Sequence, residues 1–206
     1  MEWANILTFL SAAVALSFMP GPDNIYVLTE SLTAGWRKGL YVVLGLMTGI
    51  LVHTTLAATG LALLLQQSAW LFKSVKWAGA AYLLYLAWQA YAEKPLDYNE
   101  QSVKKPQSIL FWQSYRKGFF MNVLNPKVTL FFLAFLPQFV SPNGLPAFQQ
   151  LMFLGFLFLV QGLIIFGGIA LLAGQAQTLL RQRLFWVYAR WLKISILVIL
   201  AILLLL

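Results

Sequence analysis

The sequence contains no cysteine, which excludes structural disulfides, thiolate metal sites and redox relays through thiols. Charge is scarce as well: charged residues make up 10% of the 206 positions, whereas about 25% is usual in soluble domains. The few charges are unbalanced, with a net charge of +8. In a soluble protein this excess would suggest nucleic acid, but here the basic residues lie in short connectors, where they set membrane topology. We therefore expect a bilayer around the chain and no nucleic-acid partner.

Hydrophobic residues, in contrast, fill 61% of the chain and gather into long runs. A bilayer core about 30 Å thick needs about 20 apolar residues per helix, so the chain has room for about six crossings. No basic cluster precedes the first run and no small-residue cleavage site follows it, so we expect it to be retained as a span. We expect the spans at residues 4–34, 39–65, 70–92, 108–140, 147–174 and 184–206. The sequence predicts an all-α membrane protein whose single transmembrane domain covers residues 1–206.

Basic residues are distributed unevenly between the connectors. With six crossings, eleven Lys and Arg residues fall on one side and two, Lys73 and Lys76, fall on the other. The positive-inside rule then places the long polar loop, residues 93–107, in the cytoplasm and both termini outside. In a bacterium this topology corresponds to a multi-pass protein of the cytoplasmic (inner) membrane.

Two spans are interrupted by proline. The first is broken at residues 19–24 (Met-Pro-Gly-Pro-Asp-Asn) and the fourth at residues 122–127, where an Asn-Pro pair has the residue order of a new helix start. A single proline can be a packing kink, but two breaks at matching places predict an inverted three-plus-three repeat, residues 1–92 and 108–206. Such paired interruptions point to a transporter's binding site. The expected substrate-binding residues are Pro20, Gly21, Pro22, Asp23, Asn24, Asn122, Asn125, Pro126 and Lys127.

Three charged residues stand out inside the spans. Asp23 and Lys127 occupy equivalent positions on the first turn of a half-helix, with opposite charges. An acid at a helix start can simply satisfy the dipole, but a cation there needs an anion beside it, because a membrane charge costs about 2.5 kcal/mol or more. Glu30 lies on the same helical face as Asp23, although it can also be an interfacial residue near water. Asp23 or Glu30 is the expected proton-coupling group.

Polar residues elsewhere in the spans are more ambiguous. His53 can be a satisfied buried group or a proton carrier, and Gln161 can bind substrate or hold helices together. Gly45 and Gly49, one turn apart before His53, predict a close-packing seam. We find no nucleophile with a base, and no cluster of metal ligands, so the sequence favours neither an enzyme nor a cofactor or metal site.

The motifs together resemble those of the LysE/RhtB amino-acid exporter family over essentially the whole chain. They are Pro20-Gly21-Pro22, the glycines at 35, 39, 45 and 49, Asn125-Pro126-Lys127, and Phe132 through Phe139 with its Pro-Gln-Phe ending. The resemblance implies a bacterial inner-membrane exporter of amino acids, driven by proton exchange and dimeric.

The residues fit this expectation without the family name. A zwitterionic amino acid needs an anion and a cation in one site, and Asp23 or Glu30 with Lys127 would supply both. Export of another small solute, such as a metal cation or drug, is the alternative, although one His and no Cys weaken the case for a metal. A structural membrane subunit without transport activity is a further alternative.

Overall fold

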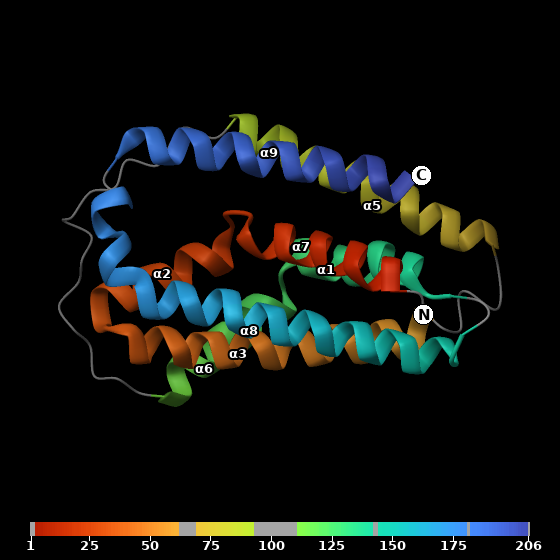
Figure 1. Ribbon diagram of the computed structural model, residues 1–206, viewed down its shortest axis with the longest axis horizontal. Coiled ribbons are helices and arrows are strands. Elements are labelled where there is room, and N and C mark those ends of the chain that lie inside the picture. The colour runs from red at the N-terminus through yellow and green to blue at the C-terminus, as the bar shows by residue number, and fades with distance from the viewer. Residues whose placement is uncertain (1–2, 62–68, 93–110, 142–143, 181, 206) are drawn as a thin grey trace.

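The computed structural model describes residues 3–61, 69–92, 111–141, 144–180 and 182–205. Within these ranges the ordered elements are all helical. Most helices run along the long axis of an elongated bundle, and the first and last described helices begin and end at the same end of it (Figure 1). The predicted loop at residues 93–107 and the ends of three predicted spans, residues 62–65, 108–110 and 206, lie outside the described residues.

The helices follow the apolar runs of the sequence, with breaks where proline or glycine interrupts them. In chain order they are α1 (Trp3–Phe18), α2 (Pro22–Ala34), α3 (Trp36–Leu56), η1 (Ala57–Leu61), α5 (Ala69–Ala92), α6 (Phe111–Val123), α7 (Pro126–Leu130), η3 (Phe131–Phe135), η4 (Leu136–Phe139), α8 (Ala147–Leu180) and α9 (Arg183–Leu205).

By length and composition, three helical stretches are apolar enough to cross a membrane: residues 36–60, 147–175 and 184–205. Two more spans result if each broken pair counts as one, α1 with α2 bent by 55° and α6 with α7 to η4 bent by 48°. The helical membrane fold and the two broken helices are confirmed. The predicted third span, α5, is not among these stretches, so the six-span inverted repeat stays a prediction.

Glycines bring α3 and α6 into close contact along one seam. A Cβ atom at Gly45 would overlap the carbonyl oxygen of Tyr115, and a Cβ at Gly118 would overlap the carbonyl oxygen of Val42. At Gly49 a Cβ would meet Asn122 Oδ1 at 2.6 Å. Small residues at such a crossing let the two backbones approach, as in other membrane helix pairs. The predicted seam at Gly45 and Gly49 is therefore confirmed, and it also places Asn122 in the interior.

Phenylalanines anchor the segment that follows the second break. Phe131 of η3 lies 6.1 Å from Phe9 of α1 and 5.3 Å from Phe158 of α8, measured between ring centroids. Phe132 lies 5.1 Å from the same Phe158. All four rings are buried. This packing holds α7 and η3 inside the bundle, between α1 and α8, and so carries Lys127 into the protein interior.

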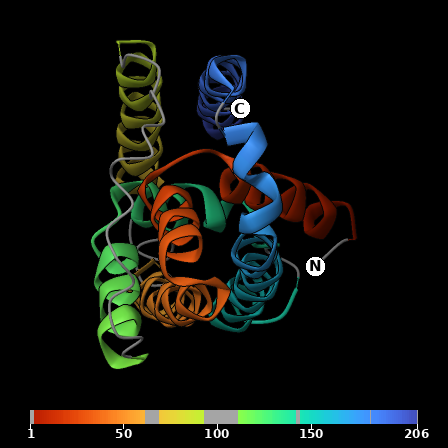
Figure 2. The same cartoon turned by 90° about the vertical axis from the view of Figure 1, so that its left-hand side faces the viewer.

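Helices α5 and α9 lie side by side along one flank of the bundle (Figures 1 and 2). Their aromatic residues contact each other, for example Tyr91 and Trp191 with ring centroids 6.3 Å apart. Helix α9 also contacts α8 and α1, and α5 contacts η3. The pair thus forms a layer over the two broken helices.

Candidate functional site

The first break leaves the carbonyl groups at the end of α1 without helical partners, and side chains from elsewhere supply the donors. Lys127 Nζ donates to the Leu16 carbonyl oxygen over 3.3 Å, and Asn24 Nδ2 donates to the Ser17 carbonyl oxygen over 2.7 Å. Helix α2 restarts with Pro22 in its first turn, where a missing N–H costs nothing. The end of α1 is therefore a polar surface inside the membrane domain.

The second break begins with a capped helix start. Asn125 is the N-cap of α7, its Oδ1 atom accepts a hydrogen bond from the Lys127 backbone N–H over 3.0 Å, and Pro126 follows in the first turn. This confirms the helix start that the Asn-Pro order predicts. The same Asn125 side chain donates from Nδ2 to Asp23 Oδ2 over 2.9 Å. One asparagine thus joins the two breaks, which lie about a hundred residues apart in the sequence.

Asp23 and Lys127 are both buried, with 3% and 8% of their surfaces exposed. Among the described residues they form no direct ion pair within 4.0 Å, and Asn125 hydrogen-bonds to the Asp23 carboxylate and to the Lys127 backbone N–H. Lys127 is at the positive end of α7, but its ammonium group reaches the last turn of α1, where the helix dipole is negative. The Lys127 ammonium group is thus stabilised partly by the C-terminal end of α1.

A small closed cavity lies between the two breaks. Its volume of about 10 Å³ leaves room for about one water molecule and not for an amino acid. Two acceptors at this place, Asp23 Oδ1 and Asn122 Oδ1, are buried and accept no hydrogen bond from the described residues. The lining residues are Leu16, Ser17, Asp23, Met47, Ile50, Asn122, Lys127, Val128, Phe158 and Phe166. The arrangement combines one anion, one cation and unused acceptors around a small space with buried, mostly apolar walls.

Comparison with known proteins shows which family the chain belongs to. The family model for the LysE type translocator matches residues 14–206. The chain belongs to the LysE type translocator family. No solved structure matches the chain.

Curated relatives of this translocator cover most of its length. A homoserine/homoserine lactone efflux protein of Salmonella typhimurium is 33% identical over 173 residues, which cover 84% of this chain and 81% of the relative. An uncharacterized membrane protein of Vibrio cholerae is 32% identical over 177 residues, 85% of this chain and 84% of the relative. The membrane protein YrhP of Bacillus subtilis is 33% identical over 146 residues, 68% and 70% of the two chains. The matched family consists of membrane translocators and not of enzymes.

Two further residues singled out by the sequence lie beside the translocator's closed cavity. His53 is buried, and its Nε2 atom lies 3.1 Å from the Asn122 carbonyl oxygen. Gln161 donates from Nε2 to the hydroxyl oxygen of Ser17 over 3.0 Å, and its Oε1 atom is buried without a partner among the described residues. Both side chains hold other helices against the breaks. Sequence reasoning missed Ser17, although a polar residue one turn before a helix break was the available signal.

Glu30 lies in the last turns of α2, away from the closed cavity. It forms an ion pair with Lys38 over 2.9 Å, with 15% and 13% of the two side chains exposed. Nearby, the Lys117 ammonium group lies 4.3 Å from the centre of the Tyr26 ring. Glu30 therefore links α2 to α3 at the end of the bundle where α2, α3 and α6 meet (Figure 1). The sequence did not reveal these partners.

A second, larger cavity touches the other face of the first break. It has a volume of about 450 Å³, and Pro20 and Asn24 form part of its wall. The structure thus divides the predicted residues of the first break, since Asp23 faces the closed cavity and Asn24 the larger one. Gly21, the N-cap of α2, is buried, and Pro22 is exposed.

Proposed function

We propose that this translocator exports amino acids across the bacterial cytoplasmic membrane in exchange for protons, and that the substrate binds where the two helix breaks meet once they move apart and enlarge the cavity between them. The observation that carries the proposal is the burial of Asp23 and Lys127 around one closed cavity, joined by Asn125. Burying two opposite charges is costly unless both are used or compensated. A zwitterionic substrate would compensate both charges, with its ammonium group at Asp23 and its carboxylate at Lys127.

The chemistry of the cavity supports a zwitterionic cargo. A substrate ammonium group has three donors, and Asp23 Oδ1 and Asn122 Oδ1 are acceptors without partners among the described residues. The Lys127 ammonium group uses one donor on the Leu16 carbonyl oxygen, which leaves two for a substrate carboxylate. A free metal cation would instead be repelled by Lys127 at the same place. The arrangement therefore favours an amino acid over a metal cation.

Asp23 is the better candidate for proton coupling. It lines the closed cavity, whereas Glu30 is already paired with Lys38 at the end of the bundle. A carboxyl group in the cavity can hold either a proton or the substrate ammonium group, and this competition would couple the two movements. One proton moving inward through 100 mV provides about 2.3 kcal/mol, enough for roughly a 50-fold outward gradient of a neutral cargo.

The proposal includes six spans with both termini outside. Helix α5 has 24 residues and is therefore about 36 Å long, enough to cross a core about 30 Å thick. Its two cations, Lys73 and Lys76, lie near its start, where long side chains can extend to the interface. With α5 counted, the two broken helices are the first and the fourth spans, as an inverted repeat requires.

Reconstituted vesicles test the proposal directly. The purified protein is placed in proteoliposomes loaded with a panel of radiolabelled amino acids, and amino-acid efflux and lumenal pH are recorded together. We expect outward movement of the amino acid to carry protons inward and to stop when an uncoupler is added. Amino-acid efflux that does not depend on the proton gradient would rule out antiport. Absence of transport for every amino acid in the panel would rule out amino acids as the cargo.

Variants of the two buried charged residues then test their roles in transport. Asp23→Asn and Lys127→Gln should each reduce amino-acid transport at least about a hundredfold, because each change leaves the other charge buried without compensation. Lys73→Gln is the matched control, since this lysine is exposed on α5. Full activity of Asp23→Asn, with proton movement intact, would show that Asp23 is not the coupling residue.

A further inference from the structure

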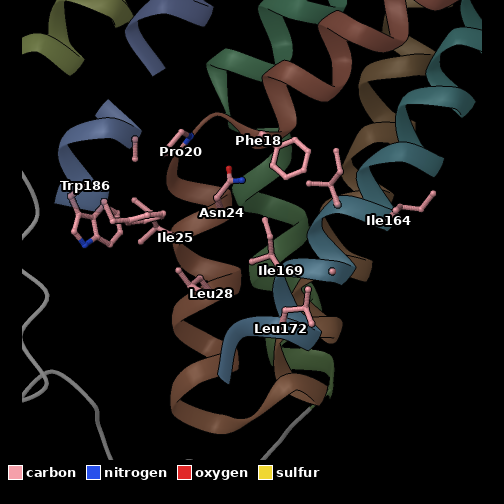
Figure 3. A pocket seen from close by; sticks show the side chains of 13 residues that line it. Phe18, Pro20, Asn24, Ile25, Leu28, Ile164, Ile169, Leu172 and Trp186 are labelled. Carbon is pink, nitrogen blue, oxygen red and sulfur yellow. The ribbon is translucent and has the colours of Figure 1, made fainter. Parts of the chain in front are cut away.

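The larger cavity is a groove between the first helix break, α8 and α9. Side chains from the three elements form its wall (Figure 3). Its volume is about 450 Å³. Thirteen residues line it: Phe18, Pro20, Asn24, Ile25, Leu28, Ile164, Ile165, Gly168, Ile169, Leu172, Phe185, Trp186 and Ala189. Its size is within the range of about 300–1,000 Å³ that is usual for small-molecule sites.

The groove is almost entirely apolar. Aliphatic side chains and aromatic rings make up its wall, and the side-chain amide of Asn24 is its main polar group. Asn24 Nδ2 donates to the Ser17 carbonyl oxygen, while Asn24 Oδ1 accepts no hydrogen bond from the described residues. A side chain ending in a charge would lose its water there and gain little beyond the neutral amide of Asn24. The chemistry suits an apolar group.

The main chain of the first break separates the groove from the closed cavity. Ser17 and Asp23 face the closed cavity, and their chain neighbours Phe18 and Asn24 face the groove. A cargo whose charged groups contact Asp23 would therefore place its side chain in the groove when the first break moves and joins the two spaces. At this break the backbone is not tied into a continuous helix.

From this placement we infer that the groove receives the side chain of the cargo, so that the translocator prefers amino acids with large apolar side chains, such as leucine, isoleucine or phenylalanine. The inference rests on the proposed function, because it names the cargo of the same site. Removing an apolar group from water favours its binding roughly in proportion to its area. In a hydrophobic pocket even one methylene changes selectivity about tenfold or more.

Glycine 168 offers a direct test. It lines the groove, and a Cβ atom there would meet nothing within 4 Å, so Gly168→Leu fills the groove without forcing the backbone. Gly174→Leu is the matched control: it is the same change on the same helix, also with nothing within 4 Å, but outside the groove. Ile169→Ala is a second variant, which enlarges the groove and keeps the test available if Gly168→Leu does not fold.

Each protein is reconstituted, and transport of leucine, phenylalanine, alanine and serine is measured. We expect the wild type to prefer leucine and phenylalanine at least about tenfold over alanine. Gly168→Leu should lower the leucine-to-alanine ratio about tenfold, Ile169→Ala should raise the phenylalanine-to-leucine ratio, and Gly174→Leu should leave both ratios unchanged.

Two results would overturn the inference while leaving amino-acid export intact. One is a wild type that prefers alanine or serine. The other is a Gly168→Leu variant that slows all four amino acids equally, as would follow if a lipid chain occupied the groove. Absence of transport for every amino acid would instead contradict the proposed function itself.

Discussion

Asn125 makes two different hydrogen bonds, and a series of substitutions at this residue should separate them. Its Oδ1 atom caps α7 by accepting from the Lys127 backbone N–H, and its Nδ2 atom donates to Asp23 Oδ2. Asn125→Ser keeps a cap oxygen but has no amide to reach Asp23. Asn125→Ala removes both bonds. Asn125→Asp keeps the cap oxygen and places a second carboxylate where the donor was.

The expected magnitudes follow from these contacts. Loss of an N-cap costs about 0.5–2 kcal/mol, and loss of a hydrogen bond to a charged group costs about 1.5–3 kcal/mol. Asn125→Ser should therefore lower the free energy of unfolding by about 1.5–3 kcal/mol, and Asn125→Ala by about 2–5 kcal/mol. Asn125→Asp should be worse than Asn125→Ser at neutral pH, because two buried carboxylates would face each other at the present 2.9 Å spacing.

Unfolding in mixed micelles by increasing dodecyl sulfate, followed by tryptophan fluorescence, gives these differences. The pH dependence separates the mechanisms further: lowering the pH should recover Asn125→Asp, because a protonated carboxyl group again donates to its neighbour, and should not recover Asn125→Ala. Equal losses for Asn125→Ser and Asn125→Ala would contradict the cap. An Asn125→Asp protein as stable as wild type at neutral pH would contradict a charged Asp23 beside residue 125.

Three further outcomes follow from the packing and the charge distribution. Gly118→Ala should prevent stable folding because its Cβ would overlap the backbone of α3, whereas Gly174→Ala should have no effect, and thermal unfolding in detergent distinguishes them. Glu30→Lys and Lys38→Glu should each reduce transport, and the double exchange should recover part of it; a double variant as poor as either single one would show that this ion pair has no role. An alkaline phosphatase fused to the C-terminus should be active, and one fused within residues 93–105 inactive; the reverse pattern would contradict the topology.

Local signals in the sequence accounted for most of the helix pattern. Long apolar runs predict helices in a membrane because a lipid environment offers no other partner for backbone groups. Proline predicts a break because it lacks a donor and clashes with the preceding turn, and both breaks are where the prolines are. The cap at Asn125 and the glycine seam at Gly45 and Gly49 were also readable, since each depends on a few neighbouring residues or on helical spacing.

The number of membrane spans was harder to predict from the sequence. Helix α5 has the length of a span but carries two lysines and many aromatic residues, and by composition it is not among the stretches apolar enough to cross a membrane. Whether such a helix crosses the membrane depends on what it packs against. Here α5 lies along α9, a contact between helices far apart in the sequence.

The sequence by itself determined that this chain is a helical membrane protein with two charged helix breaks, because those properties follow from residues close together in the chain. Only the tertiary structure decided how the two helix breaks contact each other. It brought Lys127 to the Leu16 carbonyl oxygen and Asn125 to Asp23, across separations of more than a hundred residues. It also set the Asp23 side of the first break against a closed cavity and the Asn24 side against an apolar groove. Such contacts depend on how distant helices pack, and no local pattern of residue types specifies that packing.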